Sequence, residues 1–403
     1  MTSLTEPMAT DACTPSSGER SGAPVARGSA APDFQRDVHC VLGLPFDAMT
    51  MAQAVARVRL AAFSSTRCFI STPNLNFLMA ARTDRAFRDS VLNSDLSLAD
   101  GMPLIWMARL LGLPLPERVS GAGLFERLSA HDGPPVTVFF FGGPDGVAEA
   151  ACARVNASSV GLRCVGFDSP GFGSVEDISD AERIARINAS GAQFVIVALG
   201  AKKGQAWIEH NAARLDAPVL CHLGAVVNFA AGVVQRAPVW VQSVGMEWLW
   251  RIKEEPGLLK RYVDDGLQFL WLLVSRVLLE AVRRQTTRLY RHSESEPVLT
   301  YSAEPDAVKI ELVGAWDGSA LQPLRSALSS ARASGLPLRI GMRQVTHVGS
   351  ALIALLMLAF AHPAARAPMQ LLGSGPRLAR TFRRHGAEYL LQDAPAAAGS
   401  RHG

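Results

Sequence analysis

The chain contains 403 residues and 48% of them are hydrophobic, which is enough for two or three domains with substantial cores. Its formal net charge of +4 is too small to indicate nucleic-acid binding, so we expect no nucleic-acid partner. The cysteines show no CxxC pair and no metal-ligand spacing, and several lie in apolar segments. They are Cys13, Cys40, Cys68, Cys152, Cys164 and Cys221. We interpret them as buried free thiols in a reducing compartment.

The N-terminal segment is rich in Ser, Pro, Ala and Gly and contains no apolar stretch of the kind found in secretory signals. We expect residues 1–37 to form a disordered leader. The most apolar helical stretch of the chain, residues 266–282, is interrupted by Arg276 and Glu280. A single membrane-spanning helix is therefore not expected.

From residue 38 to residue 236, apolar strand-like runs alternate with amphipathic helical segments. The predicted strands are residues 68–71, 96–99, 136–142, 163–167, 194–199 and 219–223, and helical patterns between them include residues 74–92, 103–111 and 146–155. Strands separated by helices are typical of βαβ units. We therefore predict an α/β domain with a Rossmann-like, mostly parallel sheet and helices on both faces.

Residues 237–290 form an appendage of a different character. Its basic residues Arg251, Lys253, Lys260 and Arg261 surround the aromatic residues Trp240, Trp248, Trp250 and Tyr262. In the helix predicted over residues 266–284, a helical wheel places Arg276 and Glu280 on a polar side and Leu270 and Val274 on an apolar side. This combination favours a helix that lies on a membrane surface. The alternative is a helix packed on its own domain or in a dimer interface.

A polar linker, residues 291–297, precedes a second α/β pattern over residues 298–395. Strands are predicted at residues 307–313, 337–342 and 369–372, and helices at residues 318–333, 350–362 and 376–385. We expect an independent small domain of roughly a hundred residues.

Polar residues follow two of the predicted strands of the larger domain. Thr72 and Asn74 come after the strand at residues 68–71, and Asp100 comes after the strand at residues 96–99. Ligands bind at the carboxyl ends of parallel strands, so these positions predict a site. Asp100 has two interpretations from the residues alone: a base that accepts a proton from an attacking hydroxyl, or a cap of the helix that begins near Pro103.

Two glycine-containing turns and one arginine add to this site. Gly142 and Gly143 end a strand, and Gly200 precedes two lysines in a similar turn. Glycines at such turns let backbone amides approach a phosphate, but they also occur in ordinary tight turns. Arg118 lies in a constrained loop, where it either holds a carboxylate or phosphate or is simply exposed. We find no catalytic triad, HExxH or DxD pattern, and we expect no metal.

Several ordered motifs resemble the bacterial WecG/TagA/CpsF glycosyltransferases, glycosyltransferase family 26. They are Thr72-Pro73-Asn74-Leu75, Ala99-Asp100-Gly101-Met102-Pro103, Pro114-Leu115-Pro116-Glu117-Arg118-Val119-Ser120-Gly121, Phe141-Gly142-Gly143, Val197-Ala198-Leu199-Gly200-Ala201, and Arg236-Ala237-Pro238 with Glu247-Trp248 and Arg261-Tyr262. The resemblance covers residues 38–284. It implies an inverting transfer of a sugar from a UDP-sugar, a co-substrate, to a polyprenyl-diphosphate-linked saccharide, without metal or cofactor, in exopolysaccharide, capsule or cell-envelope glycan biosynthesis.

The resemblance also implies roles for individual residues and a location. Asp100 matches the family's proposed general base, and Thr72 and Asn74 match polar residues of the same pocket. Arg118 matches the pocket arginine, and Arg251 and Arg261 would join it in neutralising the diphosphate. The basic, aromatic appendage implies a cytoplasmic protein that is peripheral on the inner face of the cytoplasmic membrane.

The chain departs from the family pattern at two places. Where the family commonly reads Gly-Ala-Pro-Lys-Gln-Glu, Gly204 stands at the Gln position, and Gln205 next to it is our candidate substitute for substrate binding. Gly123 stands where an Asp is often found. Intact Asp100 favours an active enzyme. The alternative is a catalytically degenerate protein that acts as a membrane-recruited interaction scaffold.

The C-terminal domain resembles a STAS domain, the fold of anti-sigma-factor antagonists. The resemblance rests on the order of its elements and on the segment Thr346-His347-Val348-Gly349-Ser350-Ala351. Ser350 matches the serine that is phosphorylated in regulated members, whereas Gly349 replaces the preceding Asp and Leu352 replaces a Gly. These replacements favour a scaffold or partner-binding role over a phosphorylation switch.

Overall fold

The computed structural model describes residues 32–238, 240–241, 245–254, 257, 259–283, 295–361, 369–373 and 375–391, with the side chains of Arg261 and Ser319 excepted. Most of the predicted leader and residues 291–294 of the predicted linker, together with Cys13, lie outside these residues. The leader prediction is wrong for its last residues, because Phe34 and Arg36 are buried, at 1% and 8% exposure.

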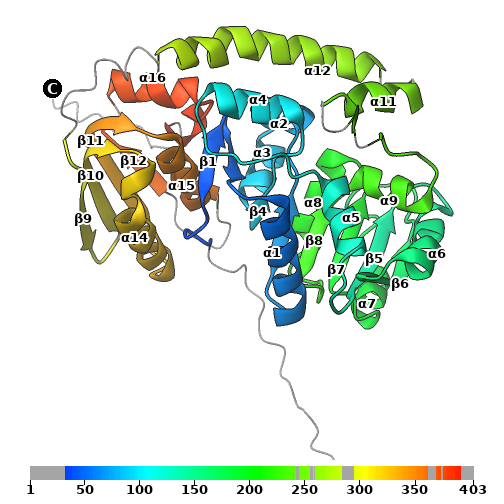
Figure 1. The fold of residues 1–403 in the computed structure, drawn as a ribbon. Coiled ribbons are helices and arrows are strands. Elements are labelled where there is room, and N and C mark those ends of the chain that lie inside the picture. Colours follow the sequence, from blue (N-terminus) through cyan, green and yellow to red (C-terminus); the bar gives the residue numbers. More distant parts are fainter. Residues whose placement is uncertain are drawn as a thin grey trace, which may run out of the picture.

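The larger sheet has six parallel strands in the order β4-β3-β8-β7-β5-β6 (Figure 1). The strands are β3 (Cys68–Ser71), β4 (Leu96–Ser97), β5 (Val136–Gly142), β6 (Leu162–Asp168), β7 (Phe194–Ala198) and β8 (Val219–His222). The Rossmann-like prediction is confirmed. Because β4 is an edge strand of only two residues, groups outside the sheet have to satisfy part of its backbone.

Helices cover both faces of this sheet, as predicted. They are α1 (Met51–Ser64), α2 (Leu75–Thr83), α3 (Arg85–Leu92), α4 (Met102–Leu110), α5 (Gly121–Ser129), α6 (Val147–Ser158), α7 (Ala181–Ala189), α8 (Ala201–Asn211) and α9 (Gly224–Ala231). Alternate residues of one strand serve the two faces: Phe140 packs with α1, α5, α6 and α9, whereas Phe141 packs with α7 and α8. The single helix predicted at residues 74–92 is two helices, because Asp84 ends α2 and caps α3.

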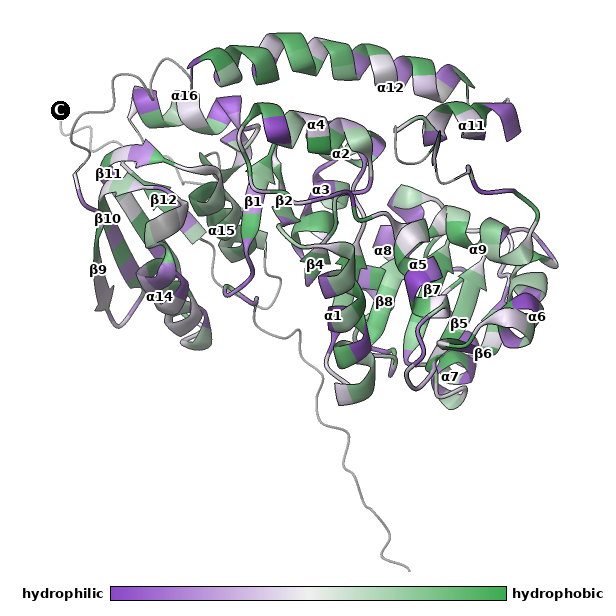
Figure 2. Cartoon of the chain, in the orientation of Figure 1, coloured by the Kyte–Doolittle hydropathy of each residue, from purple (hydrophilic) through white to green (hydrophobic). Residues whose placement is uncertain are grey.

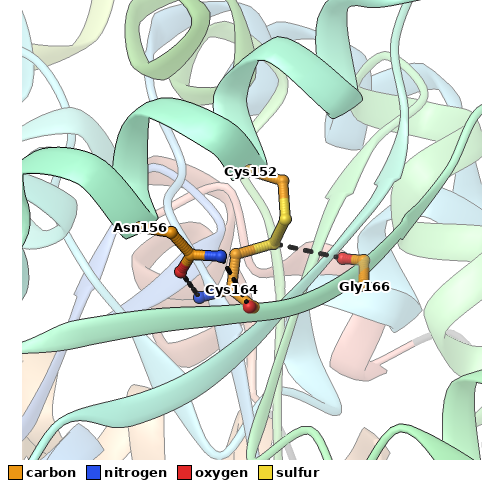
Figure 3. The surroundings of a disulfide bond; sticks show 4 residues. All are labelled: Cys152, Asn156, Cys164 and Gly166. Atoms are coloured by element: carbon orange, nitrogen blue, oxygen red, sulfur yellow. Dashed lines mark hydrogen bonds between the residues drawn. A yellow bond between two sulfur atoms is a disulfide. The ribbon is translucent and has the colours of Figure 1, made fainter.

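The cysteine interpretation is wrong for one pair. Cys152 of α6 and Cys164 of β6 form a disulfide with Cα atoms 5.2 Å apart, because the helix packs directly on its neighbouring strand (Figure 3). Beside the disulfide, Asn156 accepts a bond from the Cys164 amide at 2.8 Å and donates to the Cys164 carbonyl at 3.0 Å. The remaining described cysteines are free and buried, as predicted.

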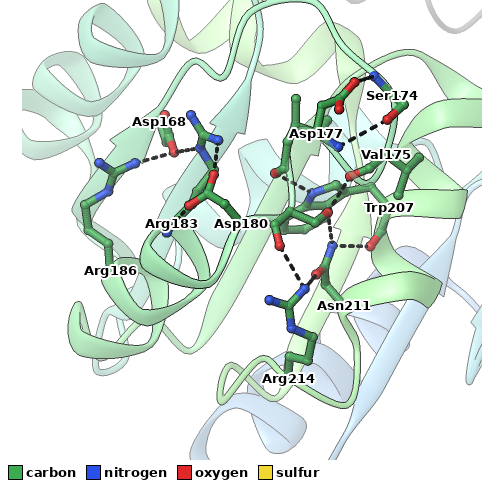
Figure 4. A network of polar contacts seen from close by, with 12 residues as sticks. Asp168, Ser174, Val175, Asp177, Asp180, Arg183, Arg186, Trp207, Asn211 and Arg214 are labelled. Carbon is green, nitrogen blue, oxygen red and sulfur yellow. Dashed lines mark hydrogen bonds and ion pairs between the residues drawn. The ribbon is translucent and has the colours of Figure 1, made fainter.

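Polar contacts hold α7 at the edge strand β6, opposite β4, and join the segment before α7 to α8. Asp168 at the end of β6 accepts bonds from Arg183 and Arg186 of α7 at 2.7 and 2.5 Å (Figure 4). Asn211 of α8 donates to Ser179 at 2.8 Å. These carboxylate and amide groups are occupied within the protein: Asp168 fixes α7 on β6, and Asn211 ties α8 to the segment that leads into α7.

The C-terminal region forms a four-stranded sheet in the order β12-β11-β10-β9 with helices on it. Its elements are β9 (Val298–Ala303), β10 (Val308–Trp316), β11 (Leu338–Val348), β12 (Met369–Leu372), α14 (Gln322–Ala333), α15 (Ser350–Ala361) and α16 (Pro376–Arg384), with 3₁₀ turns at Gly318–Ala320 and Glu388–Leu391. Strand β9 pairs antiparallel with β10 and is an element that the sequence pattern did not predict.

The C-terminal region is a separate small sheet domain, as predicted, but it shares a hydrophobic core with the N-terminal segment. An antiparallel hairpin, β1 (Val38–Val41) and β2 (Leu44–Asp47), packs on α15 and shares one hydrophobic core with it. The ten residues from Ser350 to Ala359 are all buried, because the small sheet covers one side of α15 and the hairpin covers another (Figure 1). The two halves of the chain are therefore joined by burial of apolar surface.

A long helix lies across α2, α4 and α16 (Figure 1). It follows α11 (Glu247–Glu254) and consists of α12 (Leu259–Leu272) and a π-helical stretch (Leu273–Leu278). The predicted apolar side is divided, because Phe269 and Leu273 pack inward, whereas Leu270 and Val274 are 55% exposed. Apolar residues therefore occur on its outer side as well (Figure 2). Within the described residues, no helix combines the length and apolar composition that crossing a bilayer requires.

Candidate active site

Thr72, Asn74 and Asp100 converge at the carboxyl ends of β3 and β4. The Asp100 carboxylate accepts a bond from the Gly121 amide at 3.2 Å, and the Asp100 amide donates to the Pro73 carbonyl at 3.0 Å. A Cβ added to Gly121 would lie 3.6 Å from Thr72 Oγ1, so Thr72 borders the same space. The residues that the sequence predicted to meet do meet, because parallel strands end at one edge of the sheet.

The helix-capping alternative for Asp100 does not describe its bonding. Helix α4 has Gly101 at its N-cap and no side-chain cap. The carboxylate reaches instead to the first turn of α5, whose own cap is Ser120. Asn74, by contrast, does act as a cap, because its side chain accepts a bond from the Phe77 amide at 3.1 Å.

The environment of Asp100 shifts its proton affinity. Burial, and to a lesser extent the nearby Glu247, raise the pKa of Asp100, whereas Arg118, the Gly121 amide and Arg251 lower it; the net result is a pKa of about 6. A carboxyl group with a pKa near 6 is largely ionised at neutral pH and still binds a proton readily. Such a group suits general base catalysis.

Arg118 is held by the appendage. Its Nη1 lies 2.9 Å from Glu247 Oε2 of α11, and the other oxygen of Glu247 lies 3.6 Å from Arg236 Nε. Arg236 also pairs with Glu126. In the sequence, Glu247 belongs to a motif that gives no indication of its position beside the candidate base. The appendage therefore forms one wall of the site.

Arg251, one turn further along α11, is also near the site. It is one of the charges that lower the pKa of Asp100, and its guanidinium carbon lies 5.9 Å from the centre of the Phe229 ring. Arg261 belongs to α12, and its side chain lies outside the described residues.

The predicted glycine turns have different surroundings. A Cβ on Gly142 would lie 2.6 Å from the Ala198 carbonyl oxygen, and the Gly143 amide donates to that oxygen at 2.9 Å. The first turn is thus explained by close packing of β5 on β7. Gly200 has a φ of +79°, and a Cβ there would meet no atom within 4 Å, so it faces open space.

The side chains that follow Gly200 bond to other residues of the same chain. Lys202 pairs with Asp84 at 2.9 Å, and Lys203 donates to the Gly173 carbonyl at 2.5 Å. Gln205, our candidate for substrate binding, is fully buried, and its Nε2 lies 2.5 Å from Ser71 Oγ. Its side-chain amide therefore contacts Ser71, the last residue of β3, which directly precedes Thr72.

Gly204 is explained by close packing against His222. A Cβ on Gly204 would collide with the imidazole of His222 at the end of β8. Burial lowers the pKa of His222 to about 4, so its ring is neutral at physiological pH. The imidazole fills the space that a larger side chain at position 204 would need.

Ser350 lies at the start of α15, away from Asp100. It is 5% exposed, and its Oγ lies 3.1 Å from Nδ1 of His39 in the hairpin. Its hydroxyl is therefore part of the contact between the two halves of the chain. In the described ranges, no group of three or more His, Cys, Asp or Glu side chains has the arrangement of a metal site.

The parallel α/β domain has an acidic group and arginines at its strand ends, and a small mixed-sheet domain lies beside it (Figure 1). This arrangement fits a transferase domain joined to a STAS domain. The chain belongs to the glycosyl transferase WecG/TagA/CpsF family, whose model matches residues 39–284. Residues 299–392 match the MlaB-type STAS domain model. Both resemblances seen in the sequence are confirmed.

Two relatives carry the name N-acetylglucosaminyldiphosphoundecaprenol N-acetyl-beta-D-mannosaminyltransferase. The protein from Bacillus subtilis (strain 168) is 28% identical over 197 residues, which cover 48% of this chain and 75% of the relative. The protein from Staphylococcus aureus (strain NCTC 8325 / PS 47) is 25% identical over 214 residues, which cover 52% of this chain and 82% of the relative.

Proposed function

We propose that this glycosyltransferase moves a sugar from a UDP-sugar to a polyprenyl-diphosphate-linked saccharide. The acceptor class is supported by the names of the relatives, which describe a transfer to a sugar on diphosphoundecaprenol. The observation that carries the mechanism is Asp100, placed at the strand ends with a pKa of about 6. The product would be a lipid-linked intermediate of exopolysaccharide, capsule or another envelope glycan.

The chemistry requires one proton acceptor and one leaving group. An acceptor hydroxyl oxygen attacks the anomeric carbon from the face opposite UDP, so that the new C–O bond forms as the bond to the diphosphate breaks. Asp100 takes the hydroxyl proton, and UDP leaves with the electron pair of the broken bond. Attack from the opposite face inverts the anomeric configuration.

The negative charge on the departing diphosphate needs cations or amide donors nearby. Arg118 and Arg251 stand close enough to Asp100 to affect its pKa, so they are our candidates for this role, with no metal ion required. A diphosphate that binds Arg118 would have to share it with Glu247. Thr72 Oγ1, which borders the same space, is our candidate for contact with the sugar or acceptor hydroxyl.

Membrane association is supported by the outer side of the long helix. Leu267, Leu270, Trp271 and Val274 are each at least 55% exposed, although side chains of this kind are usually buried. A lipid surface would cover them and would bring the site to a polyprenyl-linked acceptor. We propose a peripheral protein at the inner face of the cytoplasmic membrane.

The experiment is UDP release from UDP-sugars by the full chain with a polyprenyl-diphosphate-linked N-acetylglucosamine acceptor, in the presence of EDTA. Asp100→Asn should lower kcat by about 10²–10⁴-fold, the usual contribution of a general base. Asp168→Asn, at the opposite edge of the sheet, is the matched control and should leave kcat unchanged. Binding of donor and acceptor with no turnover by the unaltered chain would favour the interaction scaffold instead.

A further inference from the structure

The STAS domain contacts the N-terminal hairpin through hydrogen bonds as well as through the shared hydrophobic core. Tyr389 donates its hydroxyl to the Gly43 carbonyl at the hairpin turn, at 3.0 Å. A Cβ on Gly43, whose φ is +103°, would lie 2.7 Å from the Gly386 carbonyl oxygen, so the turn is seated directly on the STAS backbone. His39 and Ser350 meet in the same interface.

One STAS residue reaches the backbone that leads into the hairpin. Arg325 of α14 donates from Nη1 to the carbonyl oxygens of Phe34 and Arg36, each at 2.5 Å. A guanidinium shared between two carbonyls fixes both of them relative to α14. The position of Arg36 in the transferase half therefore depends directly on the STAS domain.

Arg36 in turn binds Asp47, the last residue of the hairpin. Its Nε and Nη2 bind the two carboxylate oxygens of Asp47 at 3.0 and 2.7 Å, and its Nη1 donates to the Ser94 carbonyl at 2.8 Å. Arg36 is 8% exposed and Asp47 is 4% exposed. A buried bidentate pair has one preferred geometry, and loss of either partner leaves an uncompensated buried charge.

Asp47 in turn holds the strand that carries the candidate base. Its Oδ2 accepts a bond from the Ser97 amide at 2.7 Å. Ser97 is the last residue of the edge strand β4, and Asp100 follows three positions later. The carboxylate thus occupies the side of β4 that has no neighbouring strand.

We propose that the STAS domain serves the transferase of its own chain as a positioning domain for Asp100. The restraint runs from Arg325 through the backbone at Arg36 and the Arg36–Asp47 pair to Ser97 in β4. The partner of this STAS surface is the hairpin of the same chain, so Ser350 is an interface residue. The proposal rests on Asp100 being the base of the proposed reaction.

Arg325→Ala in the full chain tests the proposal without altering the transferase half. Arg332→Ala is the matched control, because it removes the same charge two turns along the same helix, where Nε and Nη2 of Arg332 make no hydrogen bond in the described part of the chain. We expect Arg325→Ala to lower kcat at least about tenfold with little change in the donor KM, since small displacements of catalytic groups have effects of this size.

Hydrogen exchange supplies a readout that does not need activity. In Arg325→Ala, residues 94–100 should exchange amide hydrogens faster than in the unaltered chain, and in Arg332→Ala they should not. Unchanged exchange in Arg325→Ala would overturn the proposal, and so would faster exchange with an unchanged kcat. If the unaltered chain transfers no sugar, the proposed function fails. The proposal that the STAS domain positions Asp100 for catalysis then fails as well, even if hydrogen exchange shows that Arg325 restrains β4.

Discussion

Arg118 and Glu247 form an ion pair of 2.9 Å that joins the loop between α4 and α5 to the appendage helix α11. The site therefore contains a protein carboxylate at the place where a diphosphate would approach an arginine. Since Glu247 also lies near Asp100, one residue of the appendage influences both the candidate base and the candidate anion-binding group.

Glu247→Gln should move the acidic limb of the kcat/KM profile to lower pH. The negative charge of Glu247 raises the pKa of Asp100, so removal of that charge lowers it, and the base stays ionised further into the acid range. The measurement is kcat/KM between pH 4.5 and about 8. Glu254→Gln on the same helix is the control, and a limb that moves to higher pH would contradict the prediction.

Asp100→Asn should stabilise the protein at alkaline pH while it removes activity. The pKa of Asp100 is about 6 in the folded state against 3.8 as the reference, so folding disfavours the ionised form. The penalty is absent below pH 3.8, grows as the pH rises to 6 and is complete above it. We expect a gain of about 1–2 kcal/mol at pH 8 that vanishes near pH 4, measured by urea unfolding. An equal gain at both values would mean that the charge is not responsible.

Gly204→Ala should destabilise the protein, because the added methyl group collides with His222. The expected loss is about 1–3 kcal/mol in the free energy of unfolding. In the double variant Gly204→Ala/His222→Ala the loss should be smaller than the sum of the two single losses, because the collision is gone. Additive losses would show that the two positions do not share this space.

Leu270→Gln with Val274→Gln should weaken binding to phospholipid vesicles at least about tenfold, because both side chains are exposed on the outer side of the long helix. The measurement is co-sedimentation with vesicles of bacterial phospholipids. Leu60→Gln, on α1 and 60% exposed, controls for loss of an exposed leucine. Deletion of the helix is a poorer test, since Leu272 and Val277 belong to the protein core. Unchanged sedimentation of the double variant would favour a dimer interface.

Buried parallel strands were the most predictable part of the fold. Residues 68–71 and 136–142 have the predicted bounds, because continuous apolar runs between turns have few alternative structures. Strand β9 was missed because most of its residues are exposed and it only extends the edge of a sheet. The hairpin was missed because its strands pair with each other and are buried by segments from the other end of the chain.

The site was predictable as far as it lies at strand ends. Thr72 and Asp100 follow strands that are neighbours in the sheet, so their proximity follows from topology alone. Glu247 was not predictable in this way, since its position depends on how α11 folds back over the sheet. The burial of Gln205 likewise depends on which side of α8 packs on the sheet. The position of Gln205 in the family's sequence motif does not indicate that side.

The contact between His39 and Ser350 spans 311 positions of sequence. During synthesis at about 5–20 residues per second, the hairpin leaves the ribosome roughly 15–60 s before α15 exists to cover it. Until then, apolar residues such as Val41 and Phe46, which are buried in the finished protein, have no permanent partner. A chain that ends prematurely before α15 would keep these residues in water, so truncated products should be substrates for chaperones and proteases.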